Sequence, residues 1–409
     1  MSKSIVITIP VIMILLDYWP LKRFNLNKDS FILYQFKEKI PFFILSAIFS
    51  IITFFAQPHS TAINFPLRLR LANAPLSFVT YLEKTFWPHD MAVFYPFNTQ
   101  IPIWQVFGTS FFIIIISFAV IVMAKRLPYL FVGWLWYAIT LLPVIGIIQV
   151  GNHAMADRYH YLPSIGIAIM LAWGISALIK SEEVRKKILF PMAIAFLALM
   201  AFLSFKQCGY WENKNTLFSH ALQFTKNNFI VHDGLGIALF EEGKIEEAIN
   251  HFSEAILANP NYSNAYLNRG IAYFKLGKYQ RAIDDFNKAI QLRPDYAPLY
   301  YRGYIYDNLG QYQSAIKDYN EAIRLKQDYV DAYNNRGGIY FKLGQYQLAI
   351  NDYNEAIRLK RDYADAYNNR AFVYLYQGKK EPGCYDAQKA CELGNCRILE
   401  GAKVRGLCR

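Results

Sequence analysis

The sequence predicts an all-α chain in which a polytopic bundle of transmembrane helices precedes an α-solenoid of stacked helical hairpins. Two observations carry this prediction. Apolar runs, several of them long enough to cross a bilayer, crowd the first half of the 409 residues. The second half instead repeats one pattern every 33 or 34 residues. Such a period is typical of arrays whose units stack, because no single unit can bury its own apolar face.

A glycine marks the same point in each repeat. The five anchor glycines are Gly243, Gly277, Gly310, Gly344 and Gly378. Five residues after each of the first four stands an Ala-Ile pair, followed by an aromatic residue and a second alanine. This is the period of the tetratricopeptide repeat, in which two antiparallel helices form one unit. We predict a superhelix over residues 229–380, preceded by a half-repeat connection over 206–228.

A small residue stands seven positions before each anchor glycine, where the first helix of a unit must let its neighbour approach. These residues are Gly236, Gly270, Gly303, Gly337 and Ala371. An arginine directly precedes each of the last four, at Arg269, Arg302, Arg336 and Arg370. We expect these arginines to pair between helices with Asp285, Asp318 or Asp352, in a structural role.

The inner helices of such an array present a concave groove that suits an extended peptide. Asparagines recur among the positions expected to face it, and their carboxamides both donate and accept hydrogen bonds. The predicted groove residues are Asn264, Leu267, Asn268, Ile271, Phe274, Asn334, Phe341, Asp365, Asn368 and Phe372. The alternative is that this pattern belongs to the repeat itself and binds no ligand.

Residues 1–205 are predicted to form the transmembrane domain, with about six spans. The apolar runs cover residues 5–16, which is short for a span, then 40–56, 105–123, 130–148, 161–179 and 188–205. Two segments between them, 57–104 and 149–160, are expected to be external. Residues 66–87 mix leucines with cations and are expected to lie along the membrane surface, either as an anchor or as a wall of a lipid-substrate cavity.

Loop cations give the predicted orientation. The loops 21–39, 124–129 and 180–187 together hold eleven lysines and arginines, whereas the two external segments hold only Arg68, Arg70, Lys84 and Arg158. The positive-inside rule places the richer set in the cytoplasm, so the repeats lie in a periplasm or an organelle lumen. The net charge of +12 therefore reads as a topology signal rather than a nucleic-acid surface.

The shorter external loop concentrates ionisable residues beside a membrane helix. It contains His153, Asp157, Arg158 and His160. Such groups are costly next to a bilayer unless they are paired or used. One interpretation is a structural network of Asp157 and Arg158, and the other is a phosphate clamp by Arg158. The spacing of the histidines matches no metal-ligand pattern, so no metal is expected.

Three runs carry a family resemblance. They are PVIMILLDYWPLKRF, RLANAPLSFVTYLEKTFWPHDMAVFYP and AMADRYHYLPSIG, all placed before the repeats. Together they resemble the later membrane part of the transmembrane and tetratricopeptide-repeat O-mannosyltransferase family, whose members are similar to GT-C glycosyltransferases. The resemblance implies sugar transfer from a polyprenyl phosphate to a protein, with Asp157 and Arg158 as a donor-side or structural pair. Because the family's acidic first external loop has no counterpart here, we expect the N-terminal catalytic segment to be missing, and Glu83, Asp90 and Asp157 do not replace it.

Four of the five cysteines fall within residues 381–409, which we predict to form a capping helix and tail. Cys384 and Cys391 share a helix and are too far apart to pair with each other. In an oxidising compartment each is expected to pair with Cys396 or Cys408, which leaves two connectivities. A zinc site is the alternative.

Two functions follow from these features. The first is the acceptor-presenting part of an extracytoplasmic protein O-glycosylation system, with a polyprenyl-phosphate sugar as the possible donor, no certain cofactor, and the bilayer and a bound protein as partners. The alternative is a non-enzymatic membrane-tethered scaffold for assembly at the cell envelope. Polymer ligation with polyprenyl-linked glycans would require more basic external loops than this chain has.

Overall fold

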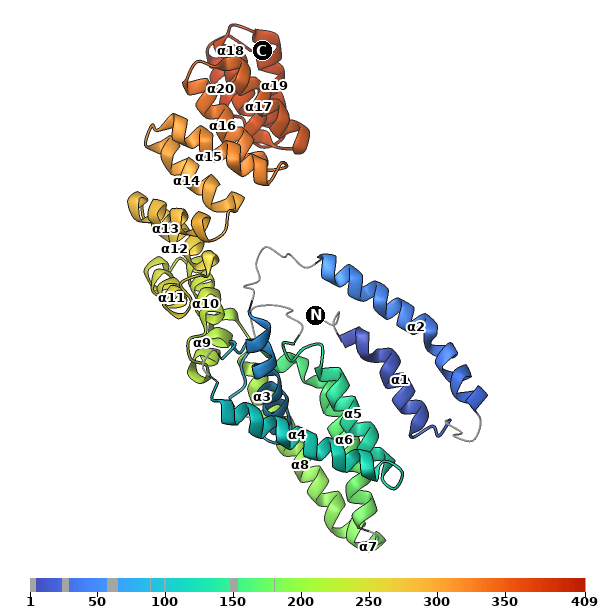
Figure 1. Cartoon of the computed structure of the whole chain (residues 1–409). Helices are drawn as coiled ribbons and strands as arrows, with labels where there is room; N and C mark the ends of the chain where they lie inside the picture. Colours follow the sequence, from blue (N-terminus) through green and yellow to red (C-terminus); the bar gives the residue numbers. More distant parts are fainter. Residues whose placement is uncertain are drawn as a thin grey trace. The chain divides into compact units, whose positions relative to one another are not determined.

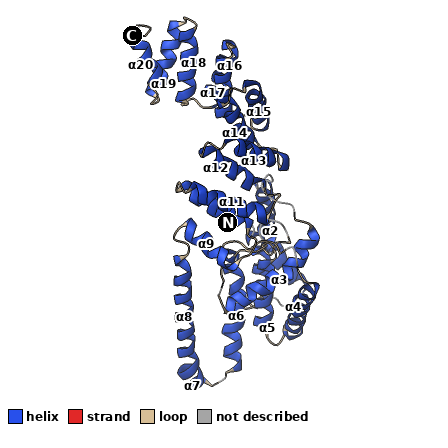
Figure 2. Ribbon diagram, turned by 90° about the vertical axis from the view of Figure 1, so that its left-hand side faces the viewer, coloured by secondary structure: helices blue, strands red, loops and turns tan. Residues whose placement is uncertain are grey.

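The computed structural model describes residues 5–23, 29–56, 65–88, 90–98, 101–147, 154–179 and 181–408. These residues confirm the predicted all-α class (Figure 1). They form no strand (Figure 2). Tyr95 and Met155 make an isolated antiparallel bridge. Contacts divide the chain into two units, Met1–Ala238 and Leu239–Arg409. His153 of the ionisable external loop lies outside the described residues.

The first unit contains the apolar helices. Its elements are η1 (Ile5–Thr8), α1 (Ile9–Tyr18), α2 (Asp29–Ala56), α3 (Leu67–Phe86), α4 (Ile103–Met123), α5 (Pro128–Leu141), η2 (Asp157–Tyr159), α6 (Tyr161–Leu178), α7 (Glu182–Val184), η3 (Arg185–Leu189), α8 (Phe190–Gly209) and α9 (Lys214–Phe224), with α10 (Phe229–Glu241) crossing into the second unit. Among the described residues, α4, α6 and the continuous helix Glu182–Gly209 are long and apolar enough to cross a membrane, while α1 and α5 are shorter.

Two helices differ from the sequence-based picture. The run predicted as one helix over 130–148 ends at Leu141, because Pro143 follows and Gly146 adopts a positive φ of 85°. One face of helix α3 packs into the core of the unit, a contact that the sequence does not predict, while its place along the membrane surface stays a prediction. Tyr81 on that face is fully buried.

The core of the first unit is built from α3, α5 and α6. The buried Tyr137 hydroxyl of α5 donates to the Phe78 carbonyl of α3 at 2.9 Å. Helices α5 and α6 approach closely at a pair of glycines, since a Cβ on Gly166 would overlap the Gly133 carbonyl oxygen. The same core contains Val144 and Ile145, just after α5, and Met155, just before η2.

The second unit is a stack of helical hairpins (Figure 1). Its helices are α11 (Ile245–Ala258), α12 (Ser263–Lys275), α13 (Tyr279–Leu292), α14 (Tyr296–Asn308), α15 (Tyr312–Leu325), α16 (Val330–Lys342), α17 (Tyr346–Leu359), α18 (Ala364–Tyr376), α19 (Lys380–Glu392) and α20 (Arg397–Val404). Each anchor glycine sits at the turn inside a hairpin with φ between 71° and 82°. Residues that carry a side chain rarely adopt this backbone conformation, which explains why each repeat has glycine at this position.

The small positions receive an aromatic ring from the partner helix sixteen residues later. Gly270 lies against Phe286, and Cβ atoms at Gly303 and Gly337 would likewise meet the rings of Tyr319 and Tyr353. The predicted close approach is confirmed at these three positions. The last hairpin has alanine at both positions of this contact. Buried Ala371 stands in the small position, and Ala387 takes the place of the aromatic ring.

The arginines clamp the hairpins as predicted. Arg336 of α16 binds both carboxylate oxygens of Asp352 on α17, at 2.8 and 2.6 Å. Its third nitrogen donates to Asn320 on the preceding α15 at 2.5 Å. The equivalent pairs are Arg269 with Asp285, Arg302 with Asp318 and Arg370 with Asp386, the last of which the sequence reading had missed. Each arginine therefore joins three helices.

Two adjacent glycines of α16 provide a test of this packing. A Cβ on Gly337 would lie 2.8 Å from the Tyr353 ring, whereas one on Gly338 would meet only the Tyr353 hydroxyl oxygen, at 3.9 Å. We expect Gly337→Ala to destabilise the array by about 1–3 kcal/mol. The control Gly338→Ala should stabilise it by up to about 1 kcal/mol, because alanine favours the helix. Hydrogen exchange of α16 and α17 peptides measures both, and equal effects would refute the packing argument.

Candidate binding cavity and repeat face

Two loops of the first unit are pinned together beside α3. The Tyr95 amide donates to the Met155 carbonyl at 3.0 Å, and the Ala154 amide donates to the Tyr95 carbonyl at 2.9 Å. The Tyr81 hydroxyl bonds both the amide and the carbonyl of Ala156, each at 2.9 Å. These hydrogen bonds hold residues 154–156 against Tyr81 of α3 and Tyr95.

Asp157 is held by one of its two carboxylate oxygens. Its Oδ2 accepts from the Ala92 amide at 2.6 Å and from the Tyr95 hydroxyl at 2.8 Å. Its Oδ1 is buried and has no hydrogen-bond partner among the residues that the structure describes. Burial raises the pKa of the Asp157 carboxyl, against the opposing effect of nearby Lys84.

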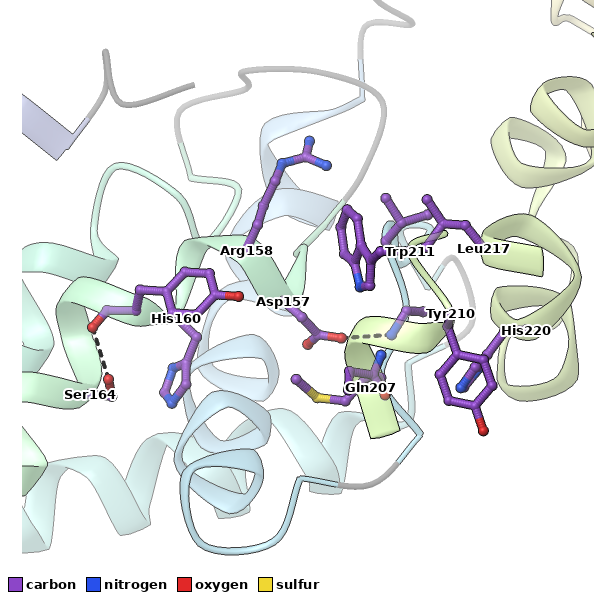
Figure 3. Close-up of a pocket in the computed structure, with 13 residues that line it drawn as sticks. Asp157, Arg158, His160, Ser164, Gln207, Tyr210, Trp211, Leu217 and His220 are labelled. Carbon is purple, nitrogen blue, oxygen red and sulfur yellow. Dashed lines mark hydrogen bonds between the residues drawn. The ribbon is translucent and has the colours of Figure 1, made fainter. Parts of the chain in front are cut away.

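Arg158 and Asp157 do not form an ion pair within the described part of the chain. The Arg158 guanidinium lies over the Phe94 ring, 4.6 Å from its centroid, and 5.1 Å from that of Tyr159. Figure 3 shows the two side chains extending in different directions from their shared turn. In the structure, the hydrogen-bond partners of Asp157 are therefore Tyr95 and the Ala92 amide instead of Arg158.

Lys84 is a residue whose place the sequence reading missed. The sequence predicts Lys84 as an external cation on the amphipathic segment 66–87. In the structure its side chain is buried and its Nζ donates to the Asp90 carbonyl at 2.9 Å. The ammonium also lies 5.1 Å from the Tyr95 ring centroid. Lys84 thereby supports the same tyrosine that binds Asp157. A cation on the core-facing side of an amphipathic helix was the available signal.

His160 is packed as a neutral side chain. Its ring stacks on Tyr81 with centroids 5.5 Å apart, and its Nε2 lies 2.7 Å from the Thr85 hydroxyl. Burial, with a further contribution from Lys84, lowers the pKa of His160 to about 4. The ring is therefore uncharged at neutral pH.

A cavity of about 110 Å³ opens beside Asp157. Its lining comes from residues 91–93, from 157–164 and from the stretch between the end of α8 and α9, including Gln207, Trp211 and His220 (Figure 3). The stretch that contains α9 is held against residues 91–93, because Ala92 and Val93 pack with Ala221 and Val231. The described residues contain no cluster of histidine, cysteine and carboxylate side chains that could hold a metal ion.

The low pKa of His160 predicts a pH effect on stability. An unfolded histidine takes up a proton near pH 6.5, whereas the folded ring takes one up only near pH 4. Stability should therefore fall by about 2 kcal/mol as the pH drops through this window, allowing for partial exposure. Unfolding of the full chain in detergent at several pH values measures the slope.

Two variants separate titration of His160 from its packing. His160→Gln should flatten the slope between pH 6.5 and 4 relative to the unmodified chain. Thr85→Val removes the hydrogen-bond partner but leaves the imidazole, so it should lower stability and keep the slope. Burial of Asp157 acts with the opposite sign, because protonation relieves its cost, and both variants leave that carboxyl in place. An unchanged slope in His160→Gln would contradict the prediction.

The structure distributes the ten predicted groove residues unevenly. Asn334 is buried and accepts from Asn369 at 3.0 Å, and buried Asn368 accepts from the Ile398 amide of α20 at 3.2 Å. The oxygens of these two carboxamides join neighbouring helices. The oxygens of Asn264 and Asp365 accept from Arg293 and Asn395. Leu267, Asn268, Ile271 and Phe274 are half-buried on α12.

Phe341 and Phe372 are brought together in an aromatic patch, which we define as Phe341, Tyr346, Phe372 and Tyr376. The rings of Phe341 and Phe372 lie 5.1 Å apart, and Tyr376 lies 5.5 Å from both Phe341 and Tyr346. Phe372 and Tyr376 are exposed. The sequence reading missed both tyrosines, although Tyr376 lies four residues after Phe372 on the same helix face.

The four cysteines form one of the two expected connectivities. Cys384 is bonded to Cys408, and Cys391 is bonded to Cys396. The bonds flank α20, which contacts α18 at the position that the first helix of a further hairpin would take. Cys208 is free and exposed.

Comparison with known proteins identifies the repeats. The tetratricopeptide repeat model matches residues 263–296, and the TPR repeat model matches 236–277, 303–344 and 337–378. In this region the chain is 27% identical over 131 residues to protein O-mannosyl-transferase Tmtc2 of Drosophila melanogaster and 28% identical over 131 residues to human TMTC3. Each match covers 32% of this chain and 14% of the relative. Human TMTC4 is 29% identical over 128 residues, which are 31% of this chain and 17% of that protein.

Among solved structures, YrrB, described as a TPR protein with an unusual peptide-binding site, is similar with a TM-score of 0.39 and 21% identity, over 46% of this chain and 97% of YrrB. The matches to the protein O-mannosyl-transferases, in contrast, span only 14% to 17% of the length of those proteins. The chain therefore contains tetratricopeptide repeats over residues 236–296 and 303–378, and this region is similar to part of the TMTC protein O-mannosyl-transferases.

Proposed function

We propose that this chain is a multi-pass membrane protein that holds a polypeptide on its repeats at the outer surface of the bilayer. Three helices suited to crossing a membrane support the anchoring. The distribution of loop cations supports the sidedness. Only four residues separate α8 from α9, which keeps the start of the repeat region close to the end of the last apolar helix.

We further propose that this polypeptide is an acceptor for protein O-glycosylation, with a polyprenyl-phosphate sugar as donor. The observation that carries this proposal is the similarity of the repeats to those of the O-mannosyl-transferases. Glu83 and Asp90 do not line the cavity, and Asp157 is tied to Tyr95, so the proposal assigns this chain the presentation of the acceptor rather than the chemical step.

Site-specific glycoproteomics tests the proposed function. Cells expressing the chain with Phe341→Ala and Phe372→Ala should show several-fold lower O-glycan occupancy on exported proteins than cells with the unmodified chain. Tyr385→Ala, which removes an exposed aromatic ring from α19 outside the patch, is the matched control and should leave occupancy unchanged. A reporter fused after Gly378 checks the sidedness, and a cytosolic signal would contradict the proposal.

A non-enzymatic scaffold is the second candidate, and the restriction of the similarity to the repeats favours it. Its expected result is distinct. If the chain is a scaffold, the patch variant would co-purify with fewer envelope proteins and would leave glycan occupancy unchanged. Deletion of the gene would also leave glycan occupancy unchanged.

A further inference from the structure

Polar side chains on the first helices of the hairpins already bond to the neighbouring hairpins. The Tyr363 hydroxyl, at the start of α18, donates to Asp331 of α16 at 2.8 Å. Lys342 of α16 donates to both carboxylate oxygens of Asp307 on α14, at 2.7 and 2.9 Å. A ligand would gain little from hydrogen bonds that replace existing ones. Exposed aromatic rings on the same helices offer contact without that cost.

Two groups of aromatic rings lie along these helices. The first, the upstream aromatic site, consists of Phe274 on α12, Tyr279 on α13 and Tyr304 on α14. The Phe274 centroid lies 5.5 Å from that of Tyr304 and 6.0 Å from that of Tyr279. The second group is the aromatic patch. Its Phe341 stands two repeats after Phe274. Its Phe372 stands two repeats after Tyr304, and these two rings are 41% and 38% exposed, so a ligand can reach both groups.

The hairpin contact between the two groups has charge and open space in place of rings. Asp307 stands at the repeat position that holds phenylalanine in α12 and α16, and its charge is balanced by Lys342. Gly338 stands at the position of the exposed ring, and a Cβ there would meet only the Tyr353 hydroxyl oxygen. A bound segment would therefore need apolar side chains at its two ends and polar residues between them.

Helix packing sets the distance between the two aromatic groups. Helices α12, α14 and α16 contact one another in that order. Packed helices lie about 8–10 Å apart, so two steps separate the groups by about 20 Å. An extended chain advances about 3.3 Å per residue, so about six residues connect them. Side chains six residues apart also lie on the same face of an extended chain.

Exposed lysines stand next to both aromatic groups in the sequence. They are Lys275, Lys278, Lys379 and Lys380. Across the described ranges, none of their ammonium groups has a hydrogen-bond acceptor or an ion-pair partner. Glu381 is the carboxylate that follows the last of them, so the lysines leave a positive excess. Carboxylates on a ligand would complement this charge.

We propose that these helices bind an extended acidic polypeptide segment that carries two bulky apolar side chains about six residues apart. One apolar side chain contacts the upstream aromatic site, the other contacts the aromatic patch, and polar residues pass over Asp307 and Lys342. Carboxylates next to the apolar side chains face the lysines. This proposal defines the polypeptide of the proposed function and rests on it.

Fluorescence anisotropy with labelled peptides and the full chain in detergent tests this proposal. The first peptide has nine residues, with phenylalanine second and eighth, aspartate at both ends and serine between. Its isomer has the same composition, with phenylalanine third and sixth and an aspartate next to each. We expect the first peptide to bind about tenfold more tightly, because only its phenylalanines reach both aromatic groups. Lysine in place of aspartate should weaken binding at low salt, and high salt should reduce that difference.

Variants of the chain check each contact separately. Tyr304→Ala and Phe372→Ala each remove one exposed ring and should lower the affinity of the first peptide to that of the isomer. Tyr385→Ala, outside both groups, should keep the preference. Gly338→Phe adds a ring one hairpin closer, so it should raise the affinity of the isomer. Misfolding cannot produce such a gain.

Equal affinity for the two peptides would overturn the proposal, as would an unchanged preference in both Tyr304→Ala and Phe372→Ala. Tighter binding of the lysine peptide would overturn its acidic character. A helix needs about 13 residues to cover 20 Å, so preference for a helical peptide with that spacing would exclude an extended ligand. A spacing preference without any effect on glycan occupancy would contradict only the proposed function. Occupancy that depends on the aromatic patch, without a spacing preference, would contradict only this proposal.

Discussion

Replacing Arg336 with methionine is expected to destabilise the repeat array by about 3 kcal/mol, because it leaves the Asp352 carboxylate buried without its partner. The Asp352 side chain is 9% exposed, and both of its oxygens are bound by Arg336. The Asn320 contact on the preceding hairpin is lost as well. Urea unfolding of the full chain in detergent, followed by hydrogen exchange on α15–α17 peptides, measures this loss.

The double variant Arg336→Met with Asp352→Leu provides the control. Replacing both charges by apolar side chains removes the unpaired carboxylate, so most of the lost stability should return. Burial already raises the pKa of Asp352, and removal of the guanidinium raises it further. The destabilisation of the single variant should therefore shrink as the pH falls, because protonation removes the charge of the unpaired carboxylate. A double variant as unstable as the single one would show that the clamp acts through packing alone.

Removing the Cys384–Cys408 bond is expected to cost about 3 kcal/mol, because it closes the longer loop, with a sequence separation of 24. Serine at both positions should increase hydrogen exchange in α20 and in the α18 segment around Asn368, whose oxygen accepts from the Ile398 amide. Protection in α12 and α13 should not change.

The second disulfide is the matched comparison. Cys391 and Cys396 are separated by 5 residues, so serine at both should cost less, about 2 kcal/mol. Cys208→Ser changes a free exposed thiol and should have no effect on α20. If the two disulfide variants were equally stable, loop closure would not explain the role of the longer bond.

The repeat array was predictable in detail because its signals are local and recur. An anchor glycine needs a positive φ, and a small residue needs a ring sixteen positions later, so each repeat confirms the others. The Arg370–Asp386 clamp was missed because the last hairpin replaces the ring by Ala387 and loses the visible pattern. Asn334 and Asn368 were assigned to the groove by helix position, whereas contacts between successive hairpins bury them.

The cavity was much less predictable. The sequence predicts the ionisable loop, but it offers the adjacent Arg158 as the partner of Asp157. Tyr95 and the Ala92 amide come from a loop more than sixty residues away, and His220 comes from α9. Such meetings depend on how α3, α5 and α6 pack, which residue spacing does not encode. The length of α5 was overestimated because apolarity continues past Pro143 while the helix does not.

The clamps also bear on how such a chain can grow. Each arginine needs an aspartate sixteen residues later and a polar side chain on the helix before it, so a duplicated hairpin spliced between α15 and α16 carries everything it requires. The far end obeys a different rule. There α20 contacts α18 and α19 where the first helix of another hairpin would lie, and one disulfide joins the chain on each side of it to α19.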